Sequence, residues 1–132
     1  MQEVLQFLKD NAPFYVATVD GDKPRVRPFG FVMEHDHKLW FCTNNRKNVY
    51  KQLQANPSVE ITATAPDKTW LRLRGKAVFG TTRAIKAKAL ELAPVLKNMY
   101  SVDDNLFELF YLEEAEATFC KLTGEPIKTI KL

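Results

Sequence analysis

Cysteine and histidine are scarce in this sequence, with two of each among its 132 residues. Cys42 and Cys120 are far apart and lie in apolar runs, which predicts two buried, reduced thiols and argues against a disulfide framework. His35 and His37 flank Asp36 in a predicted turn, with no other cysteine or histidine close in sequence, so a surface turn is favoured over a metal site. We therefore expect no bound metal, and acid–base hydrolysis has few histidines to use.

Long apolar runs and several well-known motifs are also missing. No stretch approaches ~18 consecutive apolar residues, so no transmembrane helix and no membrane partner are expected. The N-terminal segment MQEVLQFLKDN contains acidic residues and no small-residue cleavage pattern, which argues against a signal peptide and predicts a cytoplasmic protein. There is no G-x-S-x-G, Rossmann G-x-G-x-x-G or P-loop lysine motif, so no catalytic residue can be named from a motif.

The composition that remains is that of an ordinary globular domain, 45% hydrophobic and 27% charged, with a net charge of +3. At this length we expect one domain over residues 1–132, which buries about 65–70% of the surface that its unfolded chain would expose. Such a core leaves little room for an internal ligand cavity. A cofactor is therefore expected at the surface or at a subunit boundary, and the small net charge says little about partners.

Hydrophobic periodicity and turn signals predict an α+β protein in which most of the strands form antiparallel hairpins. Strands are expected at residues 14–19, 25–33, 39–43, 58–64, 69–79, 116–122 and 126–131. Helices are expected at residues 2–11, 45–55, 82–99 with a kink before Pro94, and 103–110. Because βαβ alternation is missing, six or seven strands in an antiparallel barrel with flanking helices is the predicted arrangement.

The turn between the strand at 39–43 and the helix at 45–55 carries unusual charge. A first helical turn normally attracts Asp or Glu, because its free N–H groups and dipole are positive. Here the turn carries Arg46 and Lys47, and no acidic residue occurs from residue 37 to residue 59. An anion such as phosphate would reverse this unfavourable balance, and a solvated basic turn is the alternative. Thr43 and Asn44 fit either interpretation, as capping residues or as phosphate ligands.

The segment PRVRPFGF is the second unusual feature. Alternation along a strand places Arg25, Arg27 and two phenylalanines on one face. Pro28 cannot donate to a strand ladder and Gly30 leaves the backbone bare, which indicates an edge, a bulge or close approach by another molecule. A flat aromatic ligand with polar rim atoms would use all of these features. The alternative is an edge strand whose arginines pair with Asp or Glu.

The segment TWLRLRGKAVF has one basic face, formed by Trp70, Arg72, Arg74 and Lys76. Such a face could contact nucleic-acid phosphates. It has no aromatic stacking platform beside the cations, however, so a solvated face or a subunit interface is favoured and no nucleic-acid partner is expected.

Taken in order, PRVRPFGF, LWFCTN, RKNVYKQL, NPSVEI and WLRLRGKAVF resemble the pyridoxamine 5′-phosphate oxidase-like FMN-binding split-barrel family, most clearly over residues 3–80. The resemblance implies a split β-barrel that forms a homodimer, with FMN in clefts between the subunits. It implies that Arg25, Val26, Arg27 and Pro28 line the isoalloxazine ring. It further implies that Thr43, Asn44, Arg46, Lys47 and Asn48 hold the phosphate, and that Trp70 lies near the cleft or the dimer interface.

Two departures bear on the activity that the resemblance implies. Pyridoxamine-phosphate oxidases carry a C-terminal stretch with Trp and Arg residues that handle the substrate, whereas this sequence ends in GEPIKTIKL. The loop between Thr43 and Lys47 is also shorter. We therefore expect an FMN-dependent oxidoreductase acting on another small molecule, and not vitamin B6 oxidation. The alternatives are a flavin carrier or sensor without turnover, and a relative that uses deazaflavin or heme.

Overall fold

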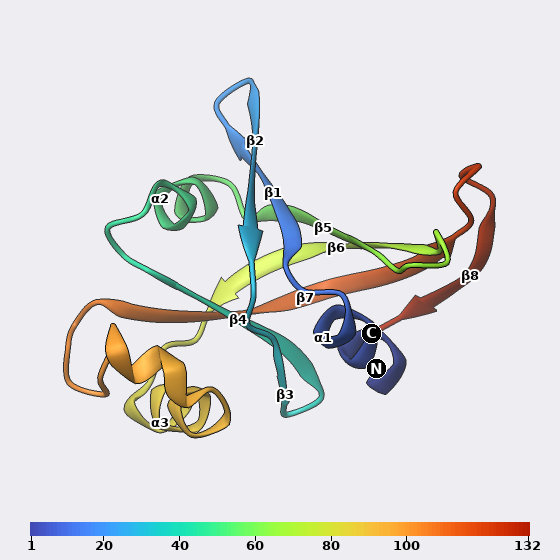
Figure 1. Cartoon of the computed structure of the whole chain (residues 1–132). Coiled ribbons are helices and arrows are strands. Elements are labelled where there is room, and N and C mark those ends of the chain that lie inside the picture. The colour runs from blue at the N-terminus through green and yellow to red at the C-terminus, as the bar shows by residue number, and fades with distance from the viewer.

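The strands of the chain form one antiparallel sheet, and the computed structural model describes all residues, 1–132 (Figure 1). The elements in chain order are α1 (Gln2–Asp10), β1 (Phe14–Asp20), β2 (Lys23–Phe29), β3 (Met33–His35), β4 (Lys38–Asn44), α2 (Asn48–Ala55), β5 (Ser58–Thr64), β6 (Trp70–Phe79), α3 (Arg83–Leu92), the 3₁₀ turn η1 (Pro94–Asn98), β7 (Phe107–Cys120) and β8 (Pro126–Lys131). The strand order is β2-β1-β5-β6-β7-β4-β3, with β8 paired to β7. The predicted antiparallel α+β fold class is confirmed.

The sheet has eight strands, one more than predicted, because the strand expected at 25–33 is two strands. β2 pairs with β1 along its whole length, from Asp20↔Lys23 to Phe14↔Phe29. β3 pairs instead with β4, which lies at the other end of the strand order. The chain must leave one edge of the sheet and reach the other between residues 29 and 33, and Gly30 lies in this crossing.

The helix expected at 103–110 is wrong. Residues from Phe107 onward belong to β7, which is 14 residues long and pairs with both β4 and β6. The spacing of Leu106, Phe107 and Phe110 also fits a helix, because a short apolar run cannot be assigned by periodicity alone. Long-range pairing decides the outcome, with Phe107 opposite Asn44. The helix expected at 82–99 is divided in two, because α3 ends at Leu92 and a separate 3₁₀ turn, η1, begins at Pro94, as the proline indicated.

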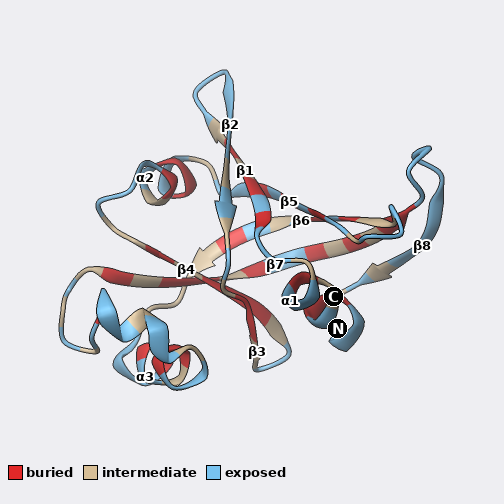
Figure 2. Ribbon diagram, in the orientation of Figure 1, coloured by how far each residue is buried: buried red, intermediate tan, exposed pale blue.

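The main core is built from buried residues of the sheet together with those of the helices α1 and α2. The rings of Phe41 and Phe110 stack at its centre with their centroids 5.5 Å apart. A smaller cluster under α3 includes Trp40, Ile85 and Phe107. Figure 2 shows buried residues along β4 and β7, whereas β2 and β8 are mostly exposed. None of the helices has the length and apolarity needed to cross a membrane.

Candidate functional site

Two adjoining hollows lie where β2, the end of β4 and the start of α2 meet. The first, called here the apolar hollow, has a volume of about 390 Å³ and is bordered mostly by hydrophobic residues of β2, the chain after it, β4 and η1. The second, called here the polar hollow, has a volume of about 620 Å³ and lies between β2 and α2. The two share Arg27, Pro28, Lys47 and Val49. Both volumes are in the range of small-molecule sites.

Most of the residues proposed from the sequence meet at these hollows. Four of them border the apolar hollow: Arg27, Pro28, Thr43 and Lys47. The polar hollow adds Arg25, Val26 and Asn48. Asn44 and Arg46 belong to the same turn but line neither hollow.

Trp70 lies apart from both hollows in the single chain. Its indole Nε1 donates a hydrogen bond of 2.8 Å to the carbonyl of Lys121, and the guanidinium of Arg72 lies 5.0 Å from its ring centroid. All three cations of the basic face on β6 are neutralised within the chain. Arg72 pairs with Glu60 at 2.8 Å, Arg74 with Glu116 at 2.6 Å and Lys76 with Glu114 at 3.1 Å.

The turn that joins β4 to α2 presents positive charge without an anion. Lys47 is the N-cap of α2 and makes no side-chain capping bond, and the first turn of the helix contains no acidic residue. Neither Arg46 nor Lys47 has a carboxylate within ion-pair distance, although nine other pairs form in the chain. The free N–H groups of the first turn and these two cations therefore favour an anion at this point.

Thr43 supplies an independent sign that a ligand belongs there. Thr43 is 3% exposed, and it is one of the residues that border the apolar hollow. Its Oγ1 is the single buried side-chain polar atom of the chain without a hydrogen-bond partner. A buried hydroxyl left unpaired costs about 1–3 kcal/mol, so native proteins rarely keep one without a reason. A polar ligand atom in the hollow would satisfy it.

The two arginines of β2 have different environments. Arg25 pairs with Asp20, with Nε and Oδ2 3.0 Å apart, so its charge is balanced. Arg27 is half-buried and contacts only neutral acceptors, the carbonyl of Val16 and the side chains of Thr18 and Gln52. Burial lowers the pKa of the Arg27 guanidinium from its usual value, the direction expected for a partly desolvated cation.

Cys42 borders the apolar hollow but is not a nucleophile. Burial raises the pKa of its thiol to about 12, and the nearby charge of Lys47 lowers it only partly. The thiol is therefore protonated at neutral pH, and a protonated thiol is unreactive. Both cysteines are free, as expected, although Cys42 is only partly buried while Cys120 is fully buried.

One wall of the apolar hollow was not predicted from the sequence. Residues from η1 and its flanks form it, among them Val95, Leu96, Met99 and Tyr100. Val95 and Met99 are 68% and 61% exposed, so this wall presents apolar surface to solvent. The repeated apolar residues after Pro94 were the only available signal, and a helix core explained them equally well.

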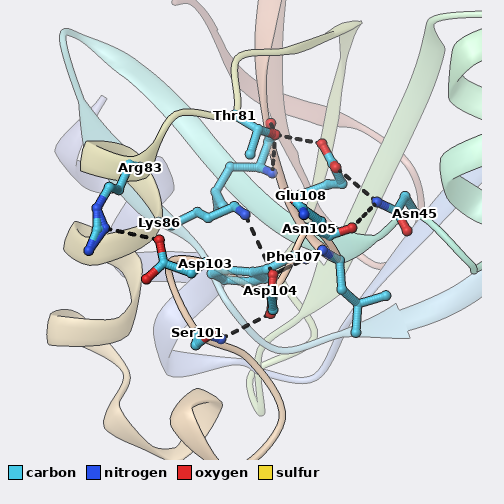
Figure 3. Close-up of polar contacts among 12 residues, drawn as sticks. Asn45, Thr81, Arg83, Lys86, Ser101, Asp103, Asp104, Asn105, Phe107 and Glu108 are labelled. Carbon is cyan, nitrogen blue, oxygen red and sulfur yellow. Dashed lines mark hydrogen bonds and ion pairs between the residues drawn. The ribbon is translucent and has the colours of Figure 1, made fainter.

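A network of hydrogen bonds holds this wall against the turn after β4 (Figure 3). Asp104 accepts backbone N–H bonds from Ser101 at 2.9 Å, Leu106 at 2.9 Å and Phe107 at 3.0 Å. Its Oδ1 also lies 3.5 Å from Nζ of Lys86, a cation that α3 buries. Partial burial would raise the pKa of Asp104, but these N–H bonds and Lys86 outweigh it and lower that pKa to about 2.

The same network reaches the turn itself. Asn45 donates side-chain hydrogen bonds to the carbonyl of Asn105 at 2.9 Å and to Glu108 at 3.2 Å. Glu108 also accepts a bond of 2.7 Å from Thr81. Asn44 donates to the hydroxyl of Tyr100 at 2.9 Å. Hydrogen bonds therefore link the turn that carries Arg46 and Lys47, called here the cationic turn, to the wall formed by η1 and its flanks, called here the apolar wall.

Comparison with known proteins identifies relatives of this arrangement. The family model described as pyridoxamine 5′-phosphate oxidase matches residues 1–116. A NimC/NimA family protein from Clostridium acetobutylicum is 45% identical, with a TM-score of 0.94, and the match covers 100% of this chain and 92% of that one. No curated protein sequence is significantly similar to the chain.

More distant solved structures share the fold. A heme binding protein from Mycobacterium smegmatis has a TM-score of 0.73 at 14% identity, covering 96% of this chain and 56% of that one. A Bacteroides thetaiotaomicron protein described as a candidate 5-nitroimidazole antibiotic resistance protein has a TM-score of 0.66 at 20% identity, covering 88% and 81%. At such identities the likeness concerns the fold alone.

Proposed function

The chain belongs to the pyridoxamine 5′-phosphate oxidase family, and from this premise we propose that it binds FMN in the two adjoining hollows and transfers electrons through it to or from a small molecule. The observation that carries the proposal is the unpaired, buried hydroxyl of Thr43, a residue that borders the same hollow as the unbalanced charge of Lys47. A phosphate group accepts hydrogen bonds from hydroxyl, ammonium and backbone N–H donors alike.

The donors of the turn fit the phosphate end of FMN. Thr43 and Lys47 would contact it directly, with Arg46 and the first N–H groups of α2, including that of Asn48, adding positive potential. Asn44 would act indirectly, because its side-chain oxygen already accepts the backbone N–H of Arg46 at 3.0 Å and so holds the shape of the turn.

The hollows also fit the flat ring. β2 pairs only with β1, so the N–H and C=O groups on its other edge are free for the polar rim of an isoalloxazine. Pro28 and Phe29 supply apolar surface beside that edge. Once bound, FMN supplies the two-electron chemistry, and the protein contributes position and charge. Arg27 would supply this charge, because a cation beside the isoalloxazine ring favours the anionic reduced form of the ring.

We further propose that two copies of the chain share the site. Both hollows are shallow, and Val26 beside them is 68% exposed on β2. A second copy would cover the ring and this apolar surface, which a monomer leaves in water. Light scattering on the FMN-loaded protein should give twice the 15.2 kDa chain mass. A monomer at micromolar concentration would contradict the homodimer.

The direct test of the proposed function is a titration with FMN. The loaded protein is expected to be yellow, with quenched fluorescence of Trp40 and Trp70. A chain that stays colourless and unquenched with excess FMN would end the proposal. Heme and a deazaflavin serve as competing ligands, and preferential binding of either would show that another cofactor is used.

Turnover separates an enzyme from a flavin carrier that shares the same site. NADH and NADPH are suitable donors, and a 5-nitroimidazole is a suitable acceptor because the Bacteroides relative is described by resistance to that class. Oxidation of a donor that depends on both FMN and the acceptor would support an oxidoreductase. If no donor is oxidised with any acceptor, the protein binds FMN without turnover, as a flavin carrier does.

Thr43→Val should have opposite effects on the apoprotein and on binding. Valine keeps the shape of the side chain and removes a hydroxyl that has no partner, so the free energy of unfolding of the apoprotein should rise by about 1 kcal/mol. FMN affinity should fall by about tenfold, because the phosphate loses a donor. Chemical denaturation without FMN and an FMN titration measure the two effects. A drop in apoprotein stability would show that the hydroxyl has a partner within the protein.

A further inference from the structure

Three neutral oxygens hold the guanidinium of Arg27. Its Nη1 donates to the carbonyl of Val16 at 3.1 Å and to the hydroxyl of Thr18 at 2.7 Å. Its Nη2 donates to Oε1 of Gln52 at 2.6 Å. The Thr18 hydroxyl in turn donates to the same Oε1 at 2.6 Å, which holds the amide oxygen in place. Three of the five N–H donors of Arg27 are used in this way, and two are left for a ligand.

This arrangement binds the arginine without neutralising it. Arg25, two positions earlier on the same strand, has a carboxylate partner, and so does Lys86, which is buried more deeply. Arg27 forms no ion pair, although it borders both hollows together with Lys47. Partly burying a cation without an anion is unfavourable. If stability were the only requirement, a carboxylate partner for Arg27 would be expected.

Gln52 is the residue at which such a pair could have formed. It is the one polar side chain that α2 buries, at 9% exposure. Glutamate has the same shape, and a carboxylate at this point could form a short, charge-assisted pair with the guanidinium. The amide oxygen of Gln52 accepts the hydrogen bond from Arg27 but does not neutralise the positive charge of the guanidinium.

We propose that Gln52 and Thr18 are positioning residues that fix Arg27 against the hollows while leaving its positive charge free to act on the bound isoalloxazine ring. This inference rests on the proposed FMN site and adds to it the residues that set the charge beside the ring. Gln52 borders the polar hollow and Thr18 borders neither hollow, and the proposed role of both is to act through Arg27.

The test is Gln52→Glu, which differs from the wild type by one non-hydrogen atom and by one charge. Arg27 would then be paired, so the reduced anionic ring loses its stabilisation. We expect the affinity ratio of reduced to oxidised FMN to fall about tenfold, equivalent to a two-electron midpoint potential about 30 mV lower. FMN and riboflavin should lose affinity by the same factor, because the effect concerns the ring that they share.

Gln54→Glu is the matched control, since it makes the same change on the exposed side of the same helix. Its midpoint potential and its ligand affinities should equal those of the wild type within about twofold, because an exposed charge is screened by solvent. Equal potentials in Gln52→Glu, Gln54→Glu and the wild type would overturn the inference while leaving FMN binding intact. A wild-type chain that binds no FMN would overturn the proposed function, and the inference with it.

Thr18→Val gives a second, independent test should Gln52→Glu fail to fold. It preserves volume but removes the hydroxyl that both anchors Arg27 and holds Gln52. FMN and riboflavin affinities should fall together by about fivefold, the range for losing one hydrogen bond to a charged group after partial compensation by the Val16 carbonyl. Unchanged affinities for both ligands would overturn the proposal.

Discussion

Lys47→Ala should weaken FMN binding by about 10- to 150-fold and leave riboflavin binding nearly unchanged. A hydrogen bond to a charged group contributes about 1.5–3 kcal/mol, and each 1.4 kcal/mol corresponds to a factor of ten. Lys47 has no carboxylate partner and borders both hollows, so its charge is available to the phosphate. Riboflavin lacks that phosphate. Parallel titrations of the apoprotein with the two ligands measure the difference.

Lys51→Ala is the control for this prediction. Lys51 lies one turn further along α2, is exposed and borders neither hollow. Its removal changes the net charge by the same amount, but FMN affinity should change by no more than about threefold, since exposed charges are screened by salt. Equal losses of FMN and riboflavin affinity in Lys47→Ala would place the lysine at the ring and contradict the assignment of the phosphate end.

Asp104→Asn should lower the free energy of unfolding by about 2 kcal/mol at pH 7. The carboxylate accepts three backbone N–H bonds and faces the buried Lys86. An asparagine offers one oxygen in place of two and no charge, so at least one N–H loses its acceptor and Lys86 loses its counter-ion. Urea denaturation of the apoprotein measures the loss.

The pH dependence of this effect has a definite sign. The pKa of Asp104 in the folded chain, about 2, is below the value of about 3.9 for an unperturbed aspartate. Its contribution is therefore complete above about pH 5 and is lost as the pH falls toward 2. The stability difference between the wild type and Asp104→Asn should shrink across that window. A difference that stays constant from pH 6 to pH 3 would contradict the carboxylate network.

Asp103→Asn is the matched control for Asp104. Asp103 pairs with Arg83 at 3.2 Å, but both side chains are largely exposed. A surface pair of this kind contributes only about 0–1 kcal/mol, so the variant should have nearly wild-type stability. Similar losses in the two variants would mean that the adjacent backbone, and not the buried network, is responsible.

The cationic turn shows how far residue chemistry alone could lead. Lys47 and Thr43 were identified because a strand, a turn and a helix follow one another directly, so their juxtaposition needs no distant contact. The lack of acidic residues around them is likewise a property of the chain itself. The sequence could not show that the Thr43 hydroxyl has no hydrogen-bond partner, because any of several neighbouring groups could have accepted a hydrogen bond from it.

Segment 103–120 shows the opposite case. The apolar residues near its start have a spacing that fits a helix, and from Phe107 onward the structure makes this segment β7. The segment forms a strand and not a helix because it pairs with β4 and β6, which lie far from it in the sequence. The same pairing carries η1 to the hollow next to Lys47. The apolar wall was therefore missed for the same reason that the helix was wrongly expected.

Arg27 combines both cases. Its place on an edge strand beside Pro28 was visible in PRVRPFGF, and so was the possibility of a ligand next to it. Whether an acidic residue would neutralise it depended on Thr18 and on Gln52, which lies 25 positions away. Turns, caps and periodicity act over a few residues, so the sequence alone determined most of the strands, the basic helix start and the family. The charge left free in the hollows was decided by contacts between distant residues, which only the folded sheet brings together.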